Sequence, residues 1–224
     1  MNTYQLLAKT IQKQKNINRA TLVGISGVDG SGKTYLTKNI ADEFEHIGET
    51  VCVVHVDDFH NSQTIRYRKG RDSPEGFYHD SIDFSSLENQ CLRPILSQTT
   101  EPLEITSKIF DLRKDTPNRV TRKISLNDIV LIEGIFLFKP KLIEYFDLRV
   151  FIDSDFDVTL PRMRSRDLGE NCTEAEILEY DRRHSCKYVP GQELYLRTVE
   201  PQRFAEIVVD NNDLENPKVS FHKN

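Results

Sequence analysis

The sequence has no run of eighteen apolar residues, which is about the length that a helix needs to cross a membrane. Its first segment, MNTYQLLAKTIQKQKN, lacks the apolar core of a secretory signal peptide. The four cysteines form no C-x-x-C pair, so we expect free thiols in a reducing cytoplasm. The formal net charge is −5, without the basic footprint that broad nucleic-acid binding normally leaves. We therefore expect a cytoplasmic protein that binds neither membranes nor nucleic acids.

Internal repeats and low-complexity segments are also absent, and 224 residues provide a sizeable core for one domain, residues 1–224. Short apolar segments alternate with amphipathic ones that have helical spacing, such as 3–16, 33–48 and 83–98. The segments predicted as strands are 19–26, 50–58, 128–136, 148–155 and 205–213. This alternation predicts an α/β fold with a doubly wound, mainly parallel five-stranded sheet.

Two further segments interrupt the alternation. Residues 101–126 alternate polar and apolar side chains on both sides of DTPN, which predicts an inserted β-hairpin. Residues 156–198 are rich in arginine and predict a helical lid between the last two strands. Pro94 is expected to bend or break the helix predicted over 83–98.

The strongest motif is Gly27-x-x-x-x-Gly32-Lys33-Thr34, which has the spacing of a phosphate-binding P-loop. Glycines let successive backbone N–H groups converge on a phosphate, and the helix that follows adds the positive end of its dipole. Lys33 is expected to reach the β- and γ-phosphates, and the Thr34 hydroxyl to ligate Mg²⁺. The residues predicted to bind the nucleotide are Gly27, Asp29, Gly30, Ser31, Gly32, Lys33 and Thr34.

Acidic residues end two of the predicted strands. VVHVDD places Asp57 and Asp58, and VLIEG places Glu133, at the sheet edge where ligands bind in open α/β folds. A carboxylate that faces the γ-phosphate from the acceptor side can accept the proton of a substrate hydroxyl. A helix N-cap is the other interpretation of Asp57, and an ordinary strand-end charge is the other interpretation of Glu133.

The P-loop alone is shared by GTPases, regulatory ATPases and small-molecule kinases. The N-K-x-D signal of guanine specificity is missing, since VVDNND at 208–213 lacks the lysine. A large regulatory ATPase would need more than 224 residues. A small-molecule kinase is therefore the best interpretation.

The chain resembles the uridine kinase and phosphoribulokinase group of P-loop kinases over residues 20–213. The segments that carry the resemblance are GISGVDGSGKT, VHVDDFH, GFYHDSIDF, VLIEGIFLF, RVFIDSDFDVTLPRMRSRD and AEIVVDNND, in the order of the family. YVPGQELYL and VEPQRFAEIVVDN are most similar to the bacterial uridine-kinase-like branch. The resemblance implies ATP as phosphate donor and Mg²⁺ as cofactor.

The resemblance also implies roles for individual residues. Asp57 matches the aspartate that faces the acceptor hydroxyl and helps to hold Mg²⁺, and Glu133 matches a glutamate that supports the same metal together with Thr34. Asp80 is similar to an acid that binds ribose hydroxyls. In KIFDLRKD, Phe110 and Asp111 occupy the aromatic and acidic places of the family's Y-D-F-x-x-H segment. The histidine of that segment is replaced by Asp115, a departure that bears on pyrimidine recognition.

Basic and imidazole side chains complete the predicted site. Arg162 and Arg166 are four residues apart, so they share one helix face and are predicted to offset charge on the transferred phosphoryl group. His79 is predicted to lie near the acceptor. The basic residues of the segment 65–76, Arg66, Arg68, Lys69 and Arg71, either bind a substrate anion or form a solvated loop.

These observations predict an ATP- and Mg²⁺-dependent kinase in which Asp57, Lys33, Arg162 and Arg166 act in catalysis. The expected partner is a small-molecule acceptor, most simply the 5′-hydroxyl of a nucleoside similar to uridine or cytidine. Nicotinamide riboside, pantothenate and a sugar phosphate remain alternative acceptors. A P-loop regulator without turnover is the alternative from another class, and the sequence leaves a homo-oligomer open.

Overall fold

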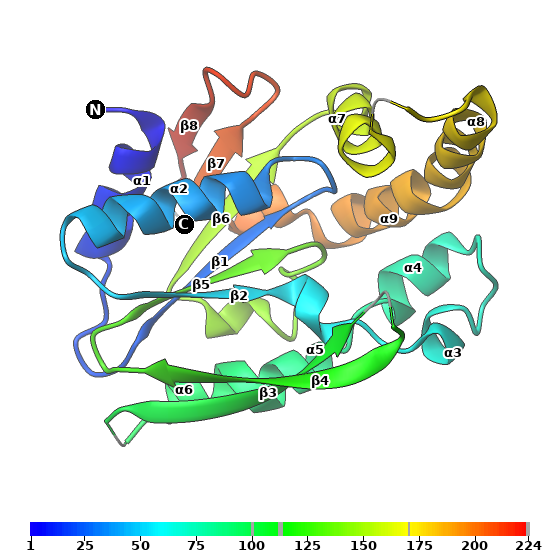
Figure 1. Cartoon of the computed structure of the whole chain (residues 1–224). Helices are drawn as coiled ribbons and strands as arrows, with labels where there is room; N and C mark the ends of the chain where they lie inside the picture. Colours follow the sequence, from blue (N-terminus) through cyan, green and yellow to red (C-terminus); the bar gives the residue numbers. More distant parts are fainter. Residues whose placement is uncertain (100, 112–113, 170, 223–224) are drawn as a thin grey trace.

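The computed structural model describes residues 1–99, 101–111, 114–169 and 171–222. Residues 112–113 of the predicted hairpin and residue 170 of the predicted lid lie outside the described residues. A six-stranded sheet with the order β2-β5-β1-β6-β7-β8 forms the centre of the molecule (Figure 1). The parallel strands are β1 (Thr21–Gly27), β2 (Val51–His55), β5 (Ile129–Gly134), β6 (Leu148–Asp153) and β7 (Ile207–Asp210).

The sixth strand, β8 (Lys218–Phe221), pairs antiparallel with β7 and corrects the predicted count of five strands. Its four residues are half-buried or exposed, so it lacks the apolar run by which the other strands are recognised. The mainly parallel α/β fold that the alternating pattern predicts is confirmed.

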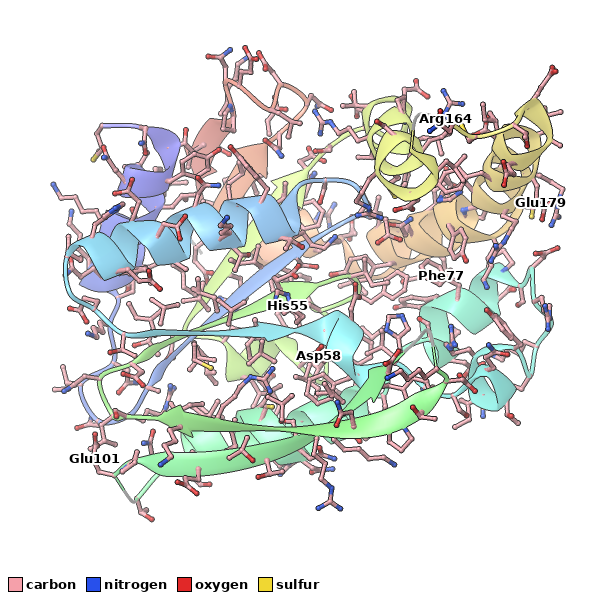
Figure 2. All side chains as sticks on the ribbon, viewed as in Figure 1. His55, Asp58, Phe77, Glu101, Arg164 and Glu179 are labelled. Atoms are coloured by element: carbon pink, nitrogen blue, oxygen red, sulfur yellow. The ribbon has the colours of Figure 1, made fainter. Side chains whose placement is uncertain are left out.

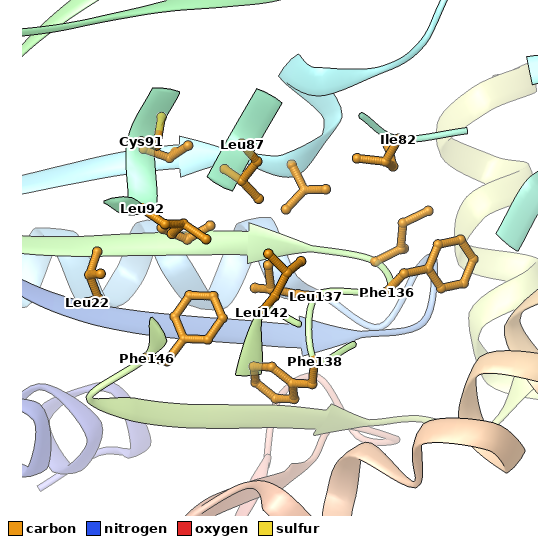
Figure 3. Packing of buried hydrophobic residues seen from close by; sticks show 14 of the residues in the cluster. Leu22, Ile82, Leu87, Cys91, Leu92, Phe136, Leu137, Phe138, Leu142 and Phe146 are labelled. Atoms are coloured by element: carbon orange, nitrogen blue, oxygen red, sulfur yellow. The ribbon is translucent and has the colours of Figure 1, made fainter. Parts of the chain in front are cut away.

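Helices cover both faces of the sheet, as expected for a doubly wound fold. On one face, α1 (Thr3–Lys13) and α2 (Lys33–His46) bury Leu7, Ile11 and Phe44 against the strands. On the other face, a larger cluster joins Leu87, Leu92 and Phe146 to the sheet (Figure 3). Burial of two separate apolar clusters fixes the sheet from both sides, so the carboxyl ends of its strands form a rigid edge.

Short helices connect β2 to the hairpin. They are η1 (Val56–Phe59), α3 (Gln63–Arg66), α4 (Pro74–Asp80), α5 (Phe84–Leu87), a π turn η2 (Glu88–Leu92) and α6 (Arg93–Leu96). The helix predicted over 83–98 runs without a gap from Phe84 to Leu96, so Pro94 does not break it, and a π turn lies directly before α6. The π turn places Pro94, which has no N–H to donate, in the first turn of α6.

The two predicted insertions lie on opposite sides of the sheet edge (Figure 1). Within 101–126, β3 (Leu103–Asp111) and β4 (Thr116–Ile124) pair antiparallel in a separate two-stranded sheet. Within 156–198 lie α7 (Phe156–Leu168), α8 (Glu174–Arg183), the π turn η4 (His184–Tyr188) and α9 (Val189–Val199). Short 3₁₀ turns, η3 (Ile143–Tyr145) and η5 (Pro201–Phe204), complete the chain.

Candidate active site

The P-loop runs from the end of β1 at Gly27 to the start of α2 at Lys33. Gly32 is the residue before the helix and has φ of +92°, a left-handed conformation that favours glycine. A Cβ atom at Gly32 would also clash with the amide of Asn211. The buried Lys33 ammonium donates a hydrogen bond to the carbonyl of Val28 over 2.8 Å. The cationic side chain is thus held across the loop where phosphates bind in such motifs.

Two side chains from distant parts of the chain hold the P-loop. The Asn211 amide donates to the carbonyl of Ser31 over 2.7 Å, and the Gln192 side-chain oxygen accepts from the N–H of Asp29. Burial raises the pKa of the Asp29 carboxyl, although the Lys33 ammonium opposes this shift. Sequence reasoning missed Gln192 and Asn211, because their only signal was their presence in the segments YVPGQELYL and AEIVVDNND.

Glu133 lies at the centre of a hydrogen-bonded group. The parallel register of β2 and β5 places His55 beside Glu133, and His55 Nδ1 lies 2.6 Å from Glu133 Oε1. The Thr34 hydroxyl donates to the same oxygen over 3.1 Å. Burial alone would raise the pKa of Glu133, but His55, Lys33 and Thr34 together lower it. Glu133 is therefore held as a carboxylate beside the P-loop. Sequence reasoning missed this partnership with His55.

Asp57 lies in η1, the 3₁₀ turn that directly follows β2. The strand ends at His55, so Asp57 and Asp58 belong to η1 and not to the strand end that was predicted. Val56 packs directly against Gly134. Any residue larger than glycine would place its Cβ atom on the Cβ atom of Val56. This close approach sets η1 against the end of β5.

The two aspartates of η1 differ in their partners. Asp58 forms an ion pair with Arg122 over 3.1 Å. Within the part of the chain that the structure describes, the exposed Asp57 carboxylate makes no hydrogen bond or ion pair.

One cavity of about 860 Å³ brings the donor-side residues together. Such a volume is in the range of small-ligand and cofactor sites. Of the predicted residues, those that line it are Asp29, Gly30, Gly32, Lys33, Thr34, Asp57, Glu133, Arg162 and Arg166. Gly27 and Ser31 do not line it, and the Ser31 side chain is buried. Figure 2 labels His55 at the end of β2, Asp58 in η1, and Arg164 on α7.

The two predicted lid arginines differ in their partners. The Arg162 guanidinium donates to the backbone carbonyls of Asn211 and Asn212 over 2.9 and 2.7 Å. Arg166 pairs with its neighbour Asp167 over 2.6 Å and is exposed to the cavity. Arg164 points elsewhere and pairs with Asp181 over 3.0 Å. Arg166 is therefore the more available cation, whereas Arg162 also joins the lid to the segment after β7.

The predicted acceptor-side residues do not line this cavity. Asp80 ends α4, is only 3% exposed, and pairs with Arg68 and with Lys69, whose ammonium lies 3.7 Å away. The hydrogen bond from Arg68 lowers the pKa of Asp80. His79 is exposed beside it, and partial burial together with Lys69 and Lys139 lowers its pKa. The basic loop thus already neutralises the acid that was expected to bind ribose.

The hairpin residues lie at a separate, smaller cavity. Phe110 lines a space of about 200 Å³ together with Phe59, His60 and Lys108. Asp111 lies at the end of β3, 3.9 Å from Lys114. Asp115 occupies the place of the histidine in the Y-D-F-x-x-H segment. It accepts hydrogen bonds from the N–H of Gln63 over 3.1 Å and from the Arg66 guanidinium over 3.3 Å. Asp115 therefore joins the hairpin to α3.

Residues 22–183 match the family described as Phosphoribulokinase / Uridine kinase. The chain belongs to this family. It is 25% identical over 202 residues to a uridine kinase of Clostridium botulinum, covering 86% of this chain and 89% of that protein. It is 28% identical over 159 residues to a uridine kinase of Bacillus mycoides, covering 68% and 69%. The structure of a possible uridine kinase from Bacillus stearothermophilus superposes with a TM-score of 0.71 at 26% identity, covering 92% and 96% of the two chains. The protein is a P-loop kinase.

The residues around Glu133 fit Mg²⁺. The Thr34 hydroxyl and the carboxylates of Asp57 and Glu133 line one cavity, and hard oxygen ligands are those that Mg²⁺ prefers. Among the described residues no cluster of three or more acidic, histidine or cysteine side chains could hold a metal by itself. Across the described ranges, no helix has the length and apolar character of a membrane span.

Proposed function

We propose that this kinase transfers the γ-phosphate of ATP to the 5′-hydroxyl of a nucleoside similar to uridine or cytidine. The observation that carries the proposal is that Lys33, Asp57 and Glu133 line a single cavity beside the P-loop. The uridine kinases to which the chain is similar support a nucleoside acceptor. Free thiols at all four cysteines agree with a reducing cytoplasm as the place of action.

The Asp57 carboxylate is suited to act as the base, because it has no partner among the described residues and faces the cavity. It orients the acceptor hydroxyl and accepts its proton as the oxygen attacks the γ-phosphorus in line with the departing ADP oxygen. Lys33 and Arg166 offset the charge of the transferred group. Mg²⁺, when bound near Thr34, Asp57 and Glu133, neutralises phosphate charge. The lid helices exclude water, which otherwise would hydrolyse ATP.

A phosphorylated acceptor such as a sugar phosphate is the second candidate. Arg68 and Lys69 pair with Asp80, so a ribose hydroxyl that binds Asp80 must displace them, whereas an acceptor phosphate would engage these cations directly. Four basic residues in the loop, Arg66, Arg68, Lys69 and Arg71, favour this alternative.

The test is ADP release from Mg·ATP over a panel of uridine, cytidine, nicotinamide riboside, pantothenate and sugar phosphates. Stimulation by uridine or cytidine supports the first candidate, and stimulation by a sugar phosphate alone replaces it with the second. If no acceptor raises ADP release above the ATP-only background, both candidates are contradicted.

Arg68→Ala sharpens the distinction between the two acceptors. For a nucleoside acceptor, loss of the cation frees Asp80, so the KM for the acceptor stays the same or falls. For a phosphorylated acceptor, loss of one charged hydrogen bond raises this KM by roughly tenfold or more. Lys123→Ala is the matched control, because Lys123 is also an exposed cation in an ion pair. Its partner is Glu104, and both residues belong to the hairpin and not to the basic loop.

A further inference from the structure

The cavity of the P-loop extends beyond the phosphate-binding residues to an aromatic surface. Tyr4, Tyr35 and Leu214 line it together with Lys33 and Thr34. They come from three parts of the chain: α1, the first turn of α2, and the segment after β7. The rings of Tyr4 and Tyr35 meet edge to face with centroids 6.2 Å apart.

These apolar groups are unusually open to solvent. Tyr35 is 58% exposed and Leu214 is 42% exposed, although both line a cavity. Exposed apolar surface gathered at a cavity marks a site that a ligand covers. A flat aromatic or heteroaromatic ring is the ligand that two tyrosine rings and an aliphatic side chain accommodate best.

Tyr4 is held firmly in position. Asn2 caps α1 by accepting the N–H of Gln5 over 2.8 Å, and Thr3 donates to the carbonyl of Pro217 over 3.2 Å. Leu7 and Ile11 on the same helix are fully buried against the sheet. The start of α1 and the segment after β7 are thus joined, so Tyr4 and Leu214 form one preformed surface.

The aromatic surface lies next to the phosphate-binding loop. Tyr35 directly follows Thr34, and Leu214 approaches within 3.7 Å of where a Cβ of Gly32 would stand. A nucleotide whose phosphates occupy the loop beside Lys33 can therefore extend its base over Tyr35 and against Leu214. We propose that Tyr4, Tyr35 and Leu214 bind the base of the donor nucleotide. This rests on the proposed function only in taking a purine nucleoside triphosphate as the donor.

Two of the three residues, Tyr4 and Leu214, lie beyond the segment matched by the family model. That segment covers residues 22–183, so the family match carries no information about these two residues. Base recognition would then combine Tyr35, inside the family-matched segment, with Tyr4 and Leu214 outside it, while phosphate binding is supplied by the P-loop.

Calorimetric titration with Mg·ATP and with Mg·tripolyphosphate, which lacks the base and ribose, tests the proposal. For Tyr35→Ala and Tyr4→Ala, we expect the Kd for ATP to rise roughly 5- to 100-fold, as loss of a base-stacking ring does. The Kd for tripolyphosphate should stay within about twofold. Tyr4→Phe should retain ATP binding, because the ring remains. Ile47→Ala, an exposed change at the other end of α2, is the control.

Two results overturn the proposal: equal weakening of ATP and tripolyphosphate, which indicates a damaged P-loop, or no change for either ligand in the alanine variants. Because these titrations contain no acceptor, they are independent of the acceptor assay. A protein that binds ATP through Tyr35 but phosphorylates no nucleoside contradicts the proposed acceptor and leaves the base site supported.

Discussion

His55 and Glu133 lie side by side on neighbouring parallel strands, with 2.6 Å between Nδ1 and Oε1. Since Glu133 is a candidate magnesium ligand, His55 is in a position to orient it. Loss of such a supporting partner typically reduces metal affinity or activity 10- to 100-fold. We expect His55→Ala to raise the Mg²⁺ concentration for half-maximal transfer by about tenfold. His46→Ala, at the far end of α2, is the control, and an unchanged Mg²⁺ profile in His55→Ala contradicts this role.

Asp57 and Asp58 offer a matched pair of carboxylates. We expect Asp57→Asn to reduce kcat by roughly 10²- to 10⁴-fold, because the acceptor hydroxyl loses its base, with little change in the Kd for ATP. Asp58→Asn removes the ion pair with Arg122, and neither residue lines the cavity, so activity should persist. Steady-state measurements of kcat and titrations with ATP on both variants show whether Asp57 alone acts as the base. Normal turnover in Asp57→Asn excludes it as the base.

Arg166 and Arg164 lie on the same helix but have different surroundings. Arg166 lines the cavity, whereas Arg164 pairs with Asp181 and does not. Loss of one charge-stabilising donor typically costs about 10²-fold or more in kcat, and we expect this of Arg166→Ala. Arg164→Ala should keep kcat within a few fold. Equal rates for the two variants would show that Arg166 does not contact the reacting phosphate.

The contact between Gly134 and Val56 predicts a specific coupling. Gly134→Ala places a Cβ within the volume of Val56, and we expect a loss of about 1–3 kcal/mol in the free energy of unfolding. Val56→Gly in the same chain should recover part of that loss, so the two changes are non-additive. Urea denaturation of the two single variants and the double variant measures the coupling. Simple additivity means that the steric contact is absent in solution.

Lys139 predicts a pH dependence of stability. Its ammonium donates to the carbonyl of Tyr78 over 2.8 Å and lies 4.2 Å from the centre of the Tyr78 ring. Burial lowers the pKa of Lys139 to about 8, from 10.5 in the unfolded chain. Between these values the unfolded state binds more protons, so the free energy of unfolding rises with pH.

We expect this rise at Lys139 to be on the order of 1–3 kcal/mol between pH 8 and 10.5. Lys139→Met has no titrating group at this position. The free energy of unfolding of the protein with Lys139, relative to that of the variant, should therefore increase over that interval. Chemical denaturation of both proteins at several pH values separates the effect from other titrating groups, which are common to both. Parallel stability profiles contradict the lowered pKa.

The residues that the sequence predicts for the donor side lie together at one cavity of the structure. Lys33 and Thr34 follow from a local motif, and Asp57 and Glu133 follow from the rule that parallel strands end at one edge. Local signals and a simple topological rule thus suffice to place them at one cavity. The sheet was predicted by the same means, except for β8, whose exposed residues carry no apolar pattern.

The acceptor half depends on contacts between distant parts of the chain. Asp80 has the residue type expected for ribose binding, but its pairing with Arg68 and Lys69 arises only when the loop 65–76 folds onto α4. Likewise, Asp115 acts as a tie between the hairpin and α3, which no local pattern indicates. Sequence periodicity carries no information about such pairings.

The supports of the P-loop have a practical consequence for shortening this chain. Gln192 and Asn211 bind the backbone at Asp29 and Ser31, and both follow the family-matched segment. A fragment cut after residue 183 would retain every residue of the phosphate-binding motif but lose both of these tethers, together with β7. The smallest unit expected to hold the loop in its binding shape therefore extends at least to Asn211, well past the boundary that the shared segment alone would suggest.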